Sequence, residues 1–179
     1  MIFISGIHGV GKSYFCNIVK DRLGIGTFSA SQLIAERKQV AFSRDKLIPD
    51  IDINQQYLLA AVEELNIKSS TYLLDGHFCL LDAIGQVSRI PIETFTALHP
   101  EAIVLLTEKP EIIAMRRKQR DNIDHDVKGI HHFQNEEIAY ATEVAELLDI
   151  PLKISTGASD LDNTLCFMRT FVGRDSNGR

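Results

Sequence analysis

An eight-residue loop near the N-terminus constrains this chain more than any other feature. Residues 6 to 13 read Gly-Ile-His-Gly-Val-Gly-Lys-Ser, which fits the pattern G-x-x-x-x-G-K-[ST], and they follow the apolar run of residues 1 to 4. Glycines let consecutive backbone N–H groups turn toward one point, and a helix that follows adds its positive N-terminal end to the same site. The pattern therefore predicts a phosphate-binding loop between a first strand and a first helix.

Two side chains of this loop carry the predicted chemistry. Lys12 is expected to reach the terminal phosphates of a nucleoside triphosphate, and the hydroxyl of Ser13 is expected to hold the accompanying Mg²⁺. We therefore predict ATP and Mg²⁺ as cofactors. The residues predicted to contact the nucleotide from this segment are Gly6, His8, Gly9, Val10, Gly11, Lys12, Ser13 and Tyr14.

Length, charge and composition limit the number of domains and the classes of partner. The chain has 179 residues, which suits a single domain, and 45% of them are hydrophobic. A net charge of -5 disfavours a nucleic-acid partner, because such readers carry a basic face. The longest apolar runs, such as residues 102–106, fall far short of the roughly 20 residues that cross a bilayer. We expect one domain over residues 1–179, with no membrane span.

Cysteine usage and the N-terminus indicate the compartment. Cys16, Cys79 and Cys166 are odd in number, far apart and outside any C-x-x-C pair, which argues against a disulfide framework and a zinc site. The first strand begins at once, without the basic and apolar regions of a signal peptide. The expected location is the cytoplasm.

Strand and helix signals alternate along the chain. Apolar runs predict strands near residues 1–4, 27–29, 71–75, 102–106 and 151–155, and helical spacing predicts helices near 14–23, 31–37, 54–67, 110–121, 136–148 and 161–171. Ser31 fits an N-cap, residues 41–53 have no sustained period and read as a loop, and residues 121–134 read as a polar connection able to act as a short lid. This alternation predicts a mostly parallel α/β sheet.

Outside the loop, one carboxylate and one basic cluster stand out. Asp75 ends an apolar strand, where an acid meets the Mg²⁺ shell from the side opposite Ser13, although a strand-end carboxylate that caps a turn is the alternative. Residues 116–120 hold four cations, and Arg116 and Arg120 share a helix face, so this pair can clamp phosphates. The alternative is a solvated basic face at a helix C-terminus.

The histidines and a second glycine motif are less informative. His77, two residues after Asp75, is a candidate contact for a substrate phosphate or hydroxyl, but a structural histidine is the favoured interpretation. The adjacent His131 and His132 point in different directions and are expected on the surface or in the lid. Residues 82–85 match the D-x-x-G of GTP-dependent switches, yet no N-K-x-D follows, so we interpret the match as chance.

Taken together, the order of these features resembles the adenylate kinase group of phosphate-loop kinases, most of all the archaeal type. The resemblance is carried by residues 6–13, the turn 29–31, residues 74–77, 99–106, the arginine helix through Arg120-Asp121, and residues 132–154. It implies a three-layer α/β/α fold with a five-stranded sheet of order 2-3-1-4-5, an acceptor-binding segment near 30–68 and a short lid near 121–134. It also implies that Asp75 acts at Mg²⁺, that Arg116 and Arg120 are lid arginines, and that Thr156 and Gly157 border the base.

One departure from that group concerns the acceptor. Typical adenylate kinases follow the Asp-Gly pair with Phe-Pro-Arg, whose arginine grips the acceptor phosphate, whereas Gly76 is followed here by His77-Phe78-Cys79. The replacement cation is left open among Arg37, Lys38, Arg44 and Arg89.

Three functions remain in view. The first is an ATP- and Mg²⁺-dependent kinase of a nucleoside monophosphate or similar small metabolite, with Lys12, Ser13, Asp75, Arg116 and Arg120 as its machinery. The second is a kinase of a nucleoside or other hydroxyl compound, for which Asp45, Asp50 and Asp52 are candidate bases. The third is a nucleotide-binding regulator with weak NTPase activity. The oligomeric state is not predicted.

Overall fold

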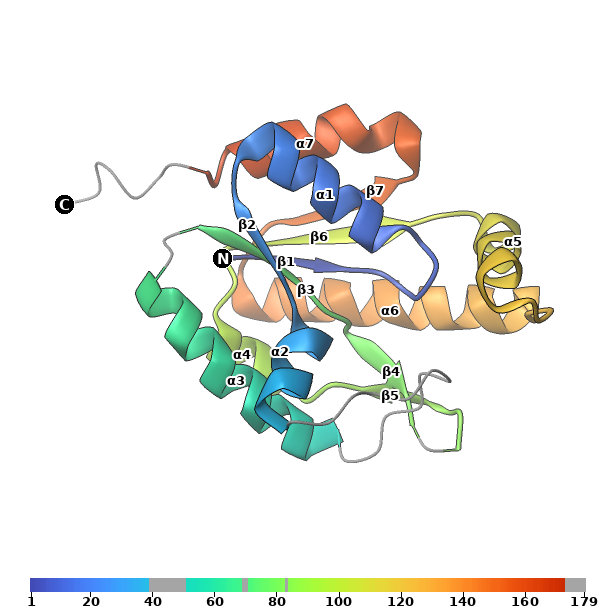
Figure 1. Ribbon diagram of the computed structural model, residues 1–179, viewed down its shortest axis with the longest axis horizontal. Coiled ribbons are helices and arrows are strands. Elements are labelled where there is room, and N and C mark those ends of the chain that lie inside the picture. The colour runs from blue at the N-terminus through green and yellow to red at the C-terminus, as the bar shows by residue number, and fades with distance from the viewer. Residues whose placement is uncertain (39–50, 69–70, 83, 173–179) are drawn as a thin grey trace.

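A parallel sheet of five strands forms the centre of the protein (Figure 1). The computed structural model describes residues 1–38, 51–68, 71–82 and 84–172. The strands are β1 (Ile2–Ser5), β2 (Gly26–Ser29), β3 (Tyr72–Asp75), β6 (Ala102–Thr107) and β7 (Leu152–Thr156). They lie in the order β2-β3-β1-β6-β7, so the predicted order 2-3-1-4-5 of the main sheet is confirmed.

The central strands explain why the sequence showed continuous apolar runs. Every residue of β1 and β6 is buried, because helices cover both faces of the sheet. The register pairs Ile4 with Asp75, Ser29 with Asp75, and Ser5 with Leu105. The carboxyl ends of β1, β2 and β3 therefore meet at one edge of the sheet, where the phosphate loop begins.

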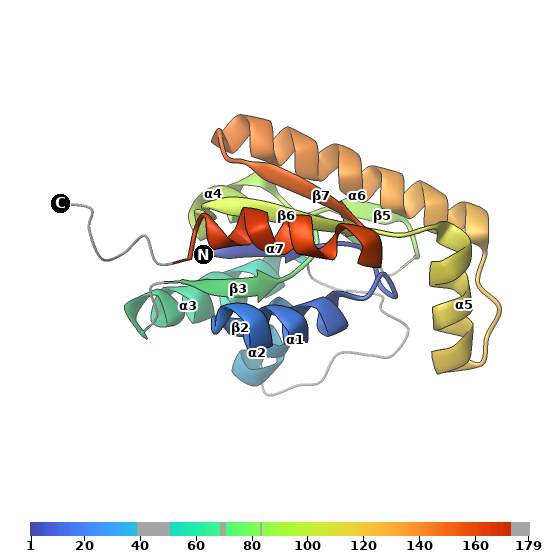
Figure 2. The same cartoon turned by 90° about the horizontal axis from the view of Figure 1, so that it is seen from above.

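Helices make the two outer layers. The helices α1 (Lys12–Leu23) and α7 (Leu161–Arg169) lie on one face of the sheet, and α3 (Ile51–Lys68), α4 (Ile92–Leu98) and α6 (Val127–Leu148) lie on the other (Figures 1 and 2). The short α2 (Ala30–Lys38) packs against α3. The helix α5 (Pro110–Asp121) stands at the carboxyl end of the strands in both views. This arrangement is the predicted three-layer α/β/α fold.

An aromatic cluster fills the space beneath β1 and β3. The rings of Phe78 and Phe95 stack at 4.7 Å between centroids, and Phe3 meets both edge-on at 5.2 and 5.6 Å. All three side chains are buried. Phe78 therefore anchors the segment that follows β3 in the hydrophobic core.

The structure also differs from the expected elements. An antiparallel hairpin of β4 (Cys79–Leu81) and β5 (Val87–Arg89), the helix α4 and the short 3-10 helix η1 (Ala158–Asp160) were not predicted. Residues 51–53 begin α3 rather than belonging to a loop, and Ser31 lies inside α2 rather than capping it. Residues 39–50, with Arg44, Asp45 and Asp50, lie outside the described residues.

The largest correction concerns the expected polar connection at 121–134. The helix α6 begins at Val127, nine residues earlier than predicted, so only residues 122–126 separate it from α5. The cause is Asp126, whose carboxylate accepts hydrogen bonds from the backbone N–H groups of Lys128 and Gly129 at 3.1 and 3.0 Å. No described helix is both long enough and apolar enough to cross a membrane.

Candidate active site

The loop between β1 and α1 has the conformation of an anion-binding loop. Gly6, Gly9 and Gly11 adopt φ values of 140°, 86° and 112°, which only glycine reaches without strain. A Cβ on Gly6 would lie 2.6 Å from the carbonyl oxygen of Leu106. The first turn of α1 has no side-chain cap, so its N–H groups stay available to an anion.

Lys12 is the first residue of α1, and its ammonium reaches back to the start of this loop. Its ammonium donates to the carbonyl oxygen of Gly6, lies 3.4 Å from Nε2 of His77 and 4.0 Å from Oδ1 of Asp75. The residue is 8% exposed. The lysine is therefore held against the end of β3 with its charge beside the phosphate loop.

Asp75 and Ser13 are the predicted Mg²⁺ ligands, and both line the same cavity. Burial raises the pKa of the Asp75 carboxyl, and the charge of Lys12 opposes that effect. Among the described residues no group of three or more His, Cys, Asp or Glu side chains could hold a metal ion. Mg²⁺ is commonly bound through one or two carboxylates together with substrate phosphates, so one carboxylate and one hydroxyl fit this ion.

His77 and His8 face each other across the loop. Their ring centroids are 4.4 Å apart. The His77 ring contacts the phosphate loop through His8 and approaches Lys12, while its favoured interpretation as a structural histidine stays a prediction. The sequence placed His77 near Asp75, but only the fold shows which residues it faces.

The helix α5 contacts the loop from outside the cavity. Arg116 donates from Nη1 to the carbonyl oxygen of Val10 at 2.9 Å, and Arg117 donates from Nε to that of His8 at 2.8 Å. Arg120 instead lines the cavity and pairs with Asp121, its Nε lying 2.6 Å from Oδ1. The two predicted arginines therefore occupy different places, and Arg117 was missed because a third arginine in a basic run has no distinguishing signal.

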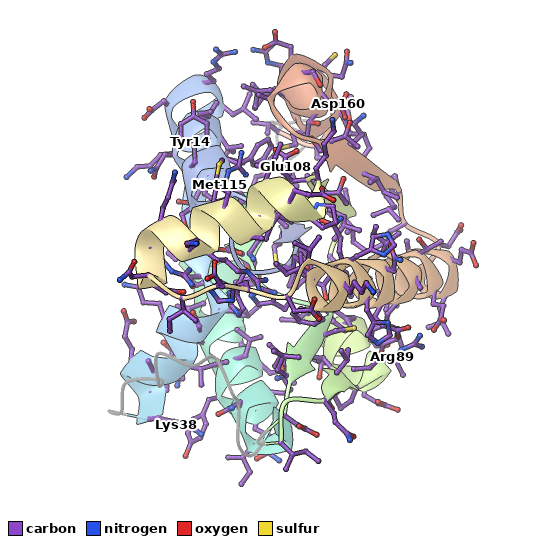
Figure 3. All side chains as sticks on the ribbon, turned by 90° about the vertical axis from the view of Figure 1, so that its right-hand side faces the viewer. Tyr14, Lys38, Arg89, Glu108, Met115 and Asp160 are labelled. Carbon is purple, nitrogen blue, oxygen red and sulfur yellow. The ribbon has the colours of Figure 1, made fainter. Side chains whose placement is uncertain are left out.

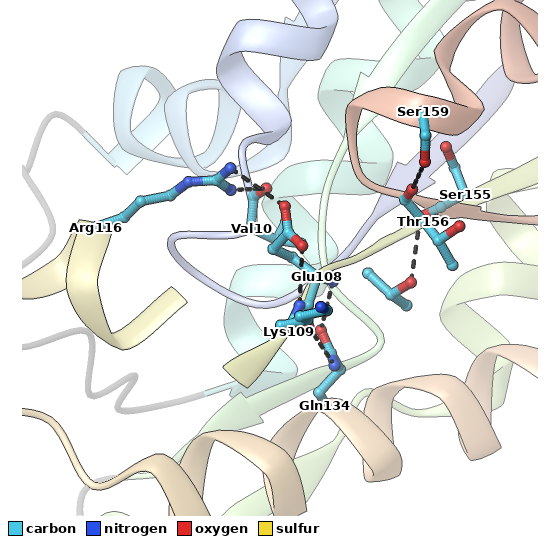
Figure 4. Close-up of polar contacts among 9 residues, drawn as sticks. Val10, Glu108, Lys109, Arg116, Gln134, Ser155, Thr156 and Ser159 are labelled. Carbon is cyan, nitrogen blue, oxygen red and sulfur yellow. Dashed lines mark hydrogen bonds and ion pairs between the residues drawn. The ribbon is translucent and has the colours of Figure 1, made fainter. Parts of the chain in front are cut away.

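The residues predicted to border the nucleotide base, Thr156 and Gly157, lie near Glu108, which is the ion-pair partner of Arg116. Arg116 pairs with Glu108 at 3.2 Å (Figure 4). The Glu108 carboxylate would lie 3.3 Å from a Cβ added to Gly157. The side-chain amide of Gln134 pairs with the backbone of Glu108 in both directions, at 3.2 and 3.0 Å. Arg116, Thr156 and Gly157 therefore border a region next to the loop and do not line the cavity that contains Ser13 and Asp75.

The cavity that Ser13 and Asp75 line has a volume of about 400 Å³. One end is lined by the phosphate loop, Asp75, His77 and Arg120, and the other by α2, α3 and α4. Polar side chains at the second end include the buried Asn54, Gln55 and Thr94, beside Ile34, Leu58, Phe95 and Leu98. A small molecule bound at the second end would therefore lie in the same cavity as the phosphate loop.

None of the described candidates for the replacement cation lines this cavity. Arg37 binds the carbonyl oxygen of Ala60 and the carboxylate of Glu64, and Lys38 lies over the ring of Tyr57. Arg89 pairs with Glu143 and Glu136. Figure 3 looks onto the end of the molecule that carries α5 and shows Lys38 and Arg89 at its periphery. Over the part of the chain that the structure describes, the arginine and lysine residues that line the cavity are Lys12 and Arg120.

Fold and loop geometry define a phosphate-loop α/β protein. The chain belongs to the family described as "AAA domain", which matches residues 5–134. It is 29% identical over 119 residues to a protein of Methanocaldococcus jannaschii named "Putative adenylate kinase", which corresponds to 66% of this chain and 58% of that relative. The chain therefore spans less than two thirds of that relative's length.

A solved structure shows a similar fold. It is a gluconokinase from Sinorhizobium meliloti 1021, with a TM-score of 0.54 and 14% sequence identity over 97% of this chain and 91% of that chain. The likeness supports the α/β architecture alone. The resemblance of the sequence to phosphate-loop kinases of the adenylate kinase group is confirmed by these comparisons.

Proposed function

We propose that the protein is a kinase that transfers the γ-phosphoryl group of Mg²⁺-bound ATP to a small molecule. The observation that carries this proposal is the continuous cavity that joins Lys12, Ser13 and Asp75 to a second compartment between α2, α3 and α4. A regulator that only binds nucleotide needs no such compartment for an acceptor. We also propose that the protein acts in the cytoplasm, which suits its three free thiols.

The residues act by position and charge. Loop N–H groups and Lys12 bind the β- and γ-phosphates, so charge that spreads over the transferred group meets fixed positive partners. Ser13 and Asp75 would hold Mg²⁺, which would neutralise the phosphate oxygens when bound. Arg120, at the same end of the cavity, adds a second cation beside the acceptor compartment.

The first candidate acceptor is a nucleoside monophosphate. The sequence resemblance and the name of the archaeal relative support it. Its phosphate oxygen attacks without a general base, because it arrives deprotonated. Arg120 and Lys12 would then be the cations that the described residues offer to both phosphate groups.

The second candidate acceptor is a nucleoside or another hydroxyl compound. The cavity favours it, because its acceptor end is lined by neutral amides, hydroxyls and apolar side chains. A phosphate held there, away from Lys12 and Arg120 at the phosphate-loop end, would lose water without gaining a cation from the described residues, at a cost above the roughly 2–7 kcal/mol estimated for a neutral polar group. The candidate bases Asp45 and Asp50 lie outside the described residues, as does the side chain of Asp52.

An ADP-release assay across monophosphates, nucleosides and small polyols tests the proposal. We expect one acceptor class to stimulate turnover, and Lys12→Ala to abolish the stimulation. Lys20→Ala, on the exposed surface of the same helix, is the matched control and should keep wild-type turnover. Mg²⁺-dependent ATP binding with turnover that no acceptor changes would instead favour the nucleotide-binding regulator.

A further inference from the structure

Glu137 is a buried acid that the proposed chemistry does not use. It lies on α6, nearly three turns after the capped N-terminus, and is 1% exposed. Burial raises the pKa of its carboxyl, while hydrogen bonds from Ser5, Phe78 and Cys79 act in the opposite direction. A carboxylate at this depth is costly unless its oxygens are fully hydrogen-bonded, so its partners indicate its role.

Those partners come from the two segments that frame the phosphate site. Oε1 accepts from the hydroxyl of Ser5, the last residue of β1, and from the backbone N–H of Phe78 at 3.0 Å. Oε2 accepts from the backbone N–H of Cys79 at 2.6 Å. Glu137 therefore ties the start of the phosphate loop to the segment that follows β3.

That segment carries His77. Its Nδ1 lies 3.9 Å from Oε1 of Glu137, and its Nε2 lies 3.4 Å from the ammonium of Lys12. The same ring lies against His8 of the phosphate loop. A continuous set of contacts thus runs from Glu137 through His77 to Lys12.

The chemistry of the donors explains why the residue is an acid. Backbone N–H groups and a hydroxyl approach both oxygens, and a carboxylate accepts at both. A glutamine would turn its NH₂ group toward one of these donors and leave it unpaired. The requirement for two acceptors therefore separates Glu137 from a packing residue, which an isosteric amide would replace without effect.

We propose that Glu137 is a positioning residue of the phosphate site, which locks residues 77–79 to the end of β1 and so keeps His77 against Lys12. The kinetic part of this proposal rests on the proposed kinase function. The structural part does not, because it concerns the placement of His77 in the free protein.

A double-mutant cycle tests the kinetic part in the full-length protein. Glu137→Gln is expected to lower kcat about tenfold to a hundredfold, the size of effect that a misplaced site produces. The double variant Glu137→Gln/His77→Ala should fall no further than His77→Ala alone. Val144→Ala, which removes buried apolar volume two turns further along α6, controls for stability and should keep kcat. Additive losses, or an equal loss in Val144→Ala, would overturn the proposal.

A spectroscopic readout covers the case in which no acceptor is turned over. The imidazole ¹⁵N signals of His77 in the nucleotide-free protein should move in Glu137→Gln and stay in place in Val144→Ala. Glu137→Asp, which keeps the charge but withdraws the carboxylate, should move them too and serves if the amide variant does not fold. Unchanged His77 signals in a folded variant overturn the assignment of Glu137, whereas absent turnover in the wild-type protein counts against the kinase function alone.

Discussion

At the scale of single residues, Gly6 is the position of the phosphate loop where an added side chain would be most disruptive. Its φ of 140° already excludes most residues, and a Cβ would lie 2.6 Å from the backbone carbonyl oxygen of Leu106 in β6. We expect Gly6→Ala to cost more than about 2 kcal/mol of unfolding free energy, the strain of a forbidden backbone plus a clash, and to weaken Mg²⁺·ATP binding.

Gly24 gives the matched comparison. It also has a positive φ, of 67°, but a Cβ added there would meet no atom within 4 Å, and the residue ends α1 away from the loop. Gly24→Ala should therefore cost about 1–2 kcal/mol from backbone strain alone and leave nucleotide affinity unchanged. Urea unfolding and calorimetric titration of both variants measure the two effects, and equal affinities would show that the loop tolerates the methyl group.

The three cysteines should differ in reactivity because of burial. Burial raises the pKa of the Cys16 and Cys79 thiols to about 12, whereas Cys166 is exposed. The thiolate is the nucleophile, so at pH 8 only about one in ten thousand of the two buried thiols is reactive. Iodoacetamide at pH 8 should modify Cys166 alone in the folded protein and all three in urea, as mass spectrometry of peptides will show. The fraction of Cys16 and Cys79 in the thiolate form should become substantial only as the pH rises toward 12. Rapid labelling of Cys16 at pH 8 would therefore contradict its buried placement.

The predictability of the site also divides residue by residue. The placement of Lys12, Ser13 and Asp75 around one cavity was predictable, because a fixed motif and a strand end mark these residues in the sequence. Glu137 and Arg117 were not, since one is an acid in an acidic helix and the other an arginine among arginines. Their roles arise from contacts with Ser5 and His8, which lie more than a hundred residues away in the sequence.

At the scale of elements, two arginines of α5 donate hydrogen bonds to two backbone carbonyl groups of the phosphate loop. Arg116 and Arg117 bind the carbonyl oxygens of Val10 and His8, and neither arginine lines the cavity. The loop is thus fixed on the side of α5 while Gly9 and Gly11 border the cavity. Burial lowers the pKa of the Arg117 guanidinium, so this cation is partly desolvated by its position.

Removing the second of these contacts should loosen the loop. A hydrogen bond from a charged donor contributes about 1.5–3 kcal/mol, and part of this energy preorganises the loop. Arg117→Ala is therefore expected to weaken Mg²⁺·ATP binding at least tenfold, or about 1.4 kcal/mol. Isothermal titration calorimetry measures the affinity. Lys118→Ala, one residue further on and paired with Asp124 at the surface, should leave it unchanged, and equal affinities in all three proteins would rule out a clamp.

Elements differed in how far the sequence could define them. The helix at 110–121 was predicted with its observed bounds, because Pro110 marks its start and the basic run its end. The hairpin β4–β5 has two strands of three residues each, too short for an alternation to be recognised. The start of α6 was missed because residues 127–134 include Gly129 and the adjacent His131 and His132, and its signal, the cap at Asp126, is one residue long.

At the scale of the whole molecule, the order of the sheet followed from family resemblance and not from any local pattern. What local patterns did supply was the alternation of buried strands and helices, which restricts the chain to a doubly covered parallel sheet. The acceptor compartment could not be foreseen in this way. It is assembled from α2, α3 and α4, of which α4 was not predicted, and its lining residues are distant from one another in the sequence.

Because the cavity is lined by segments spread from Phe3 to Arg120, including both the central sheet and its covering helices, a ligand that fills it should stabilise the fold against unfolding. A ligand that binds only the native state at about 100 times its Kd adds about 2.7 kcal/mol to the free energy of unfolding. For a chain of this size that corresponds to a rise in Tm of about 5–10 °C. Differential scanning fluorimetry should show this rise with ATP and Mg²⁺ at such an excess, a smaller one when EDTA removes Mg²⁺, and little or none in Lys12→Ala. A rise that survives in Lys12→Ala would mean that ATP stabilises the protein from a site other than the phosphate loop.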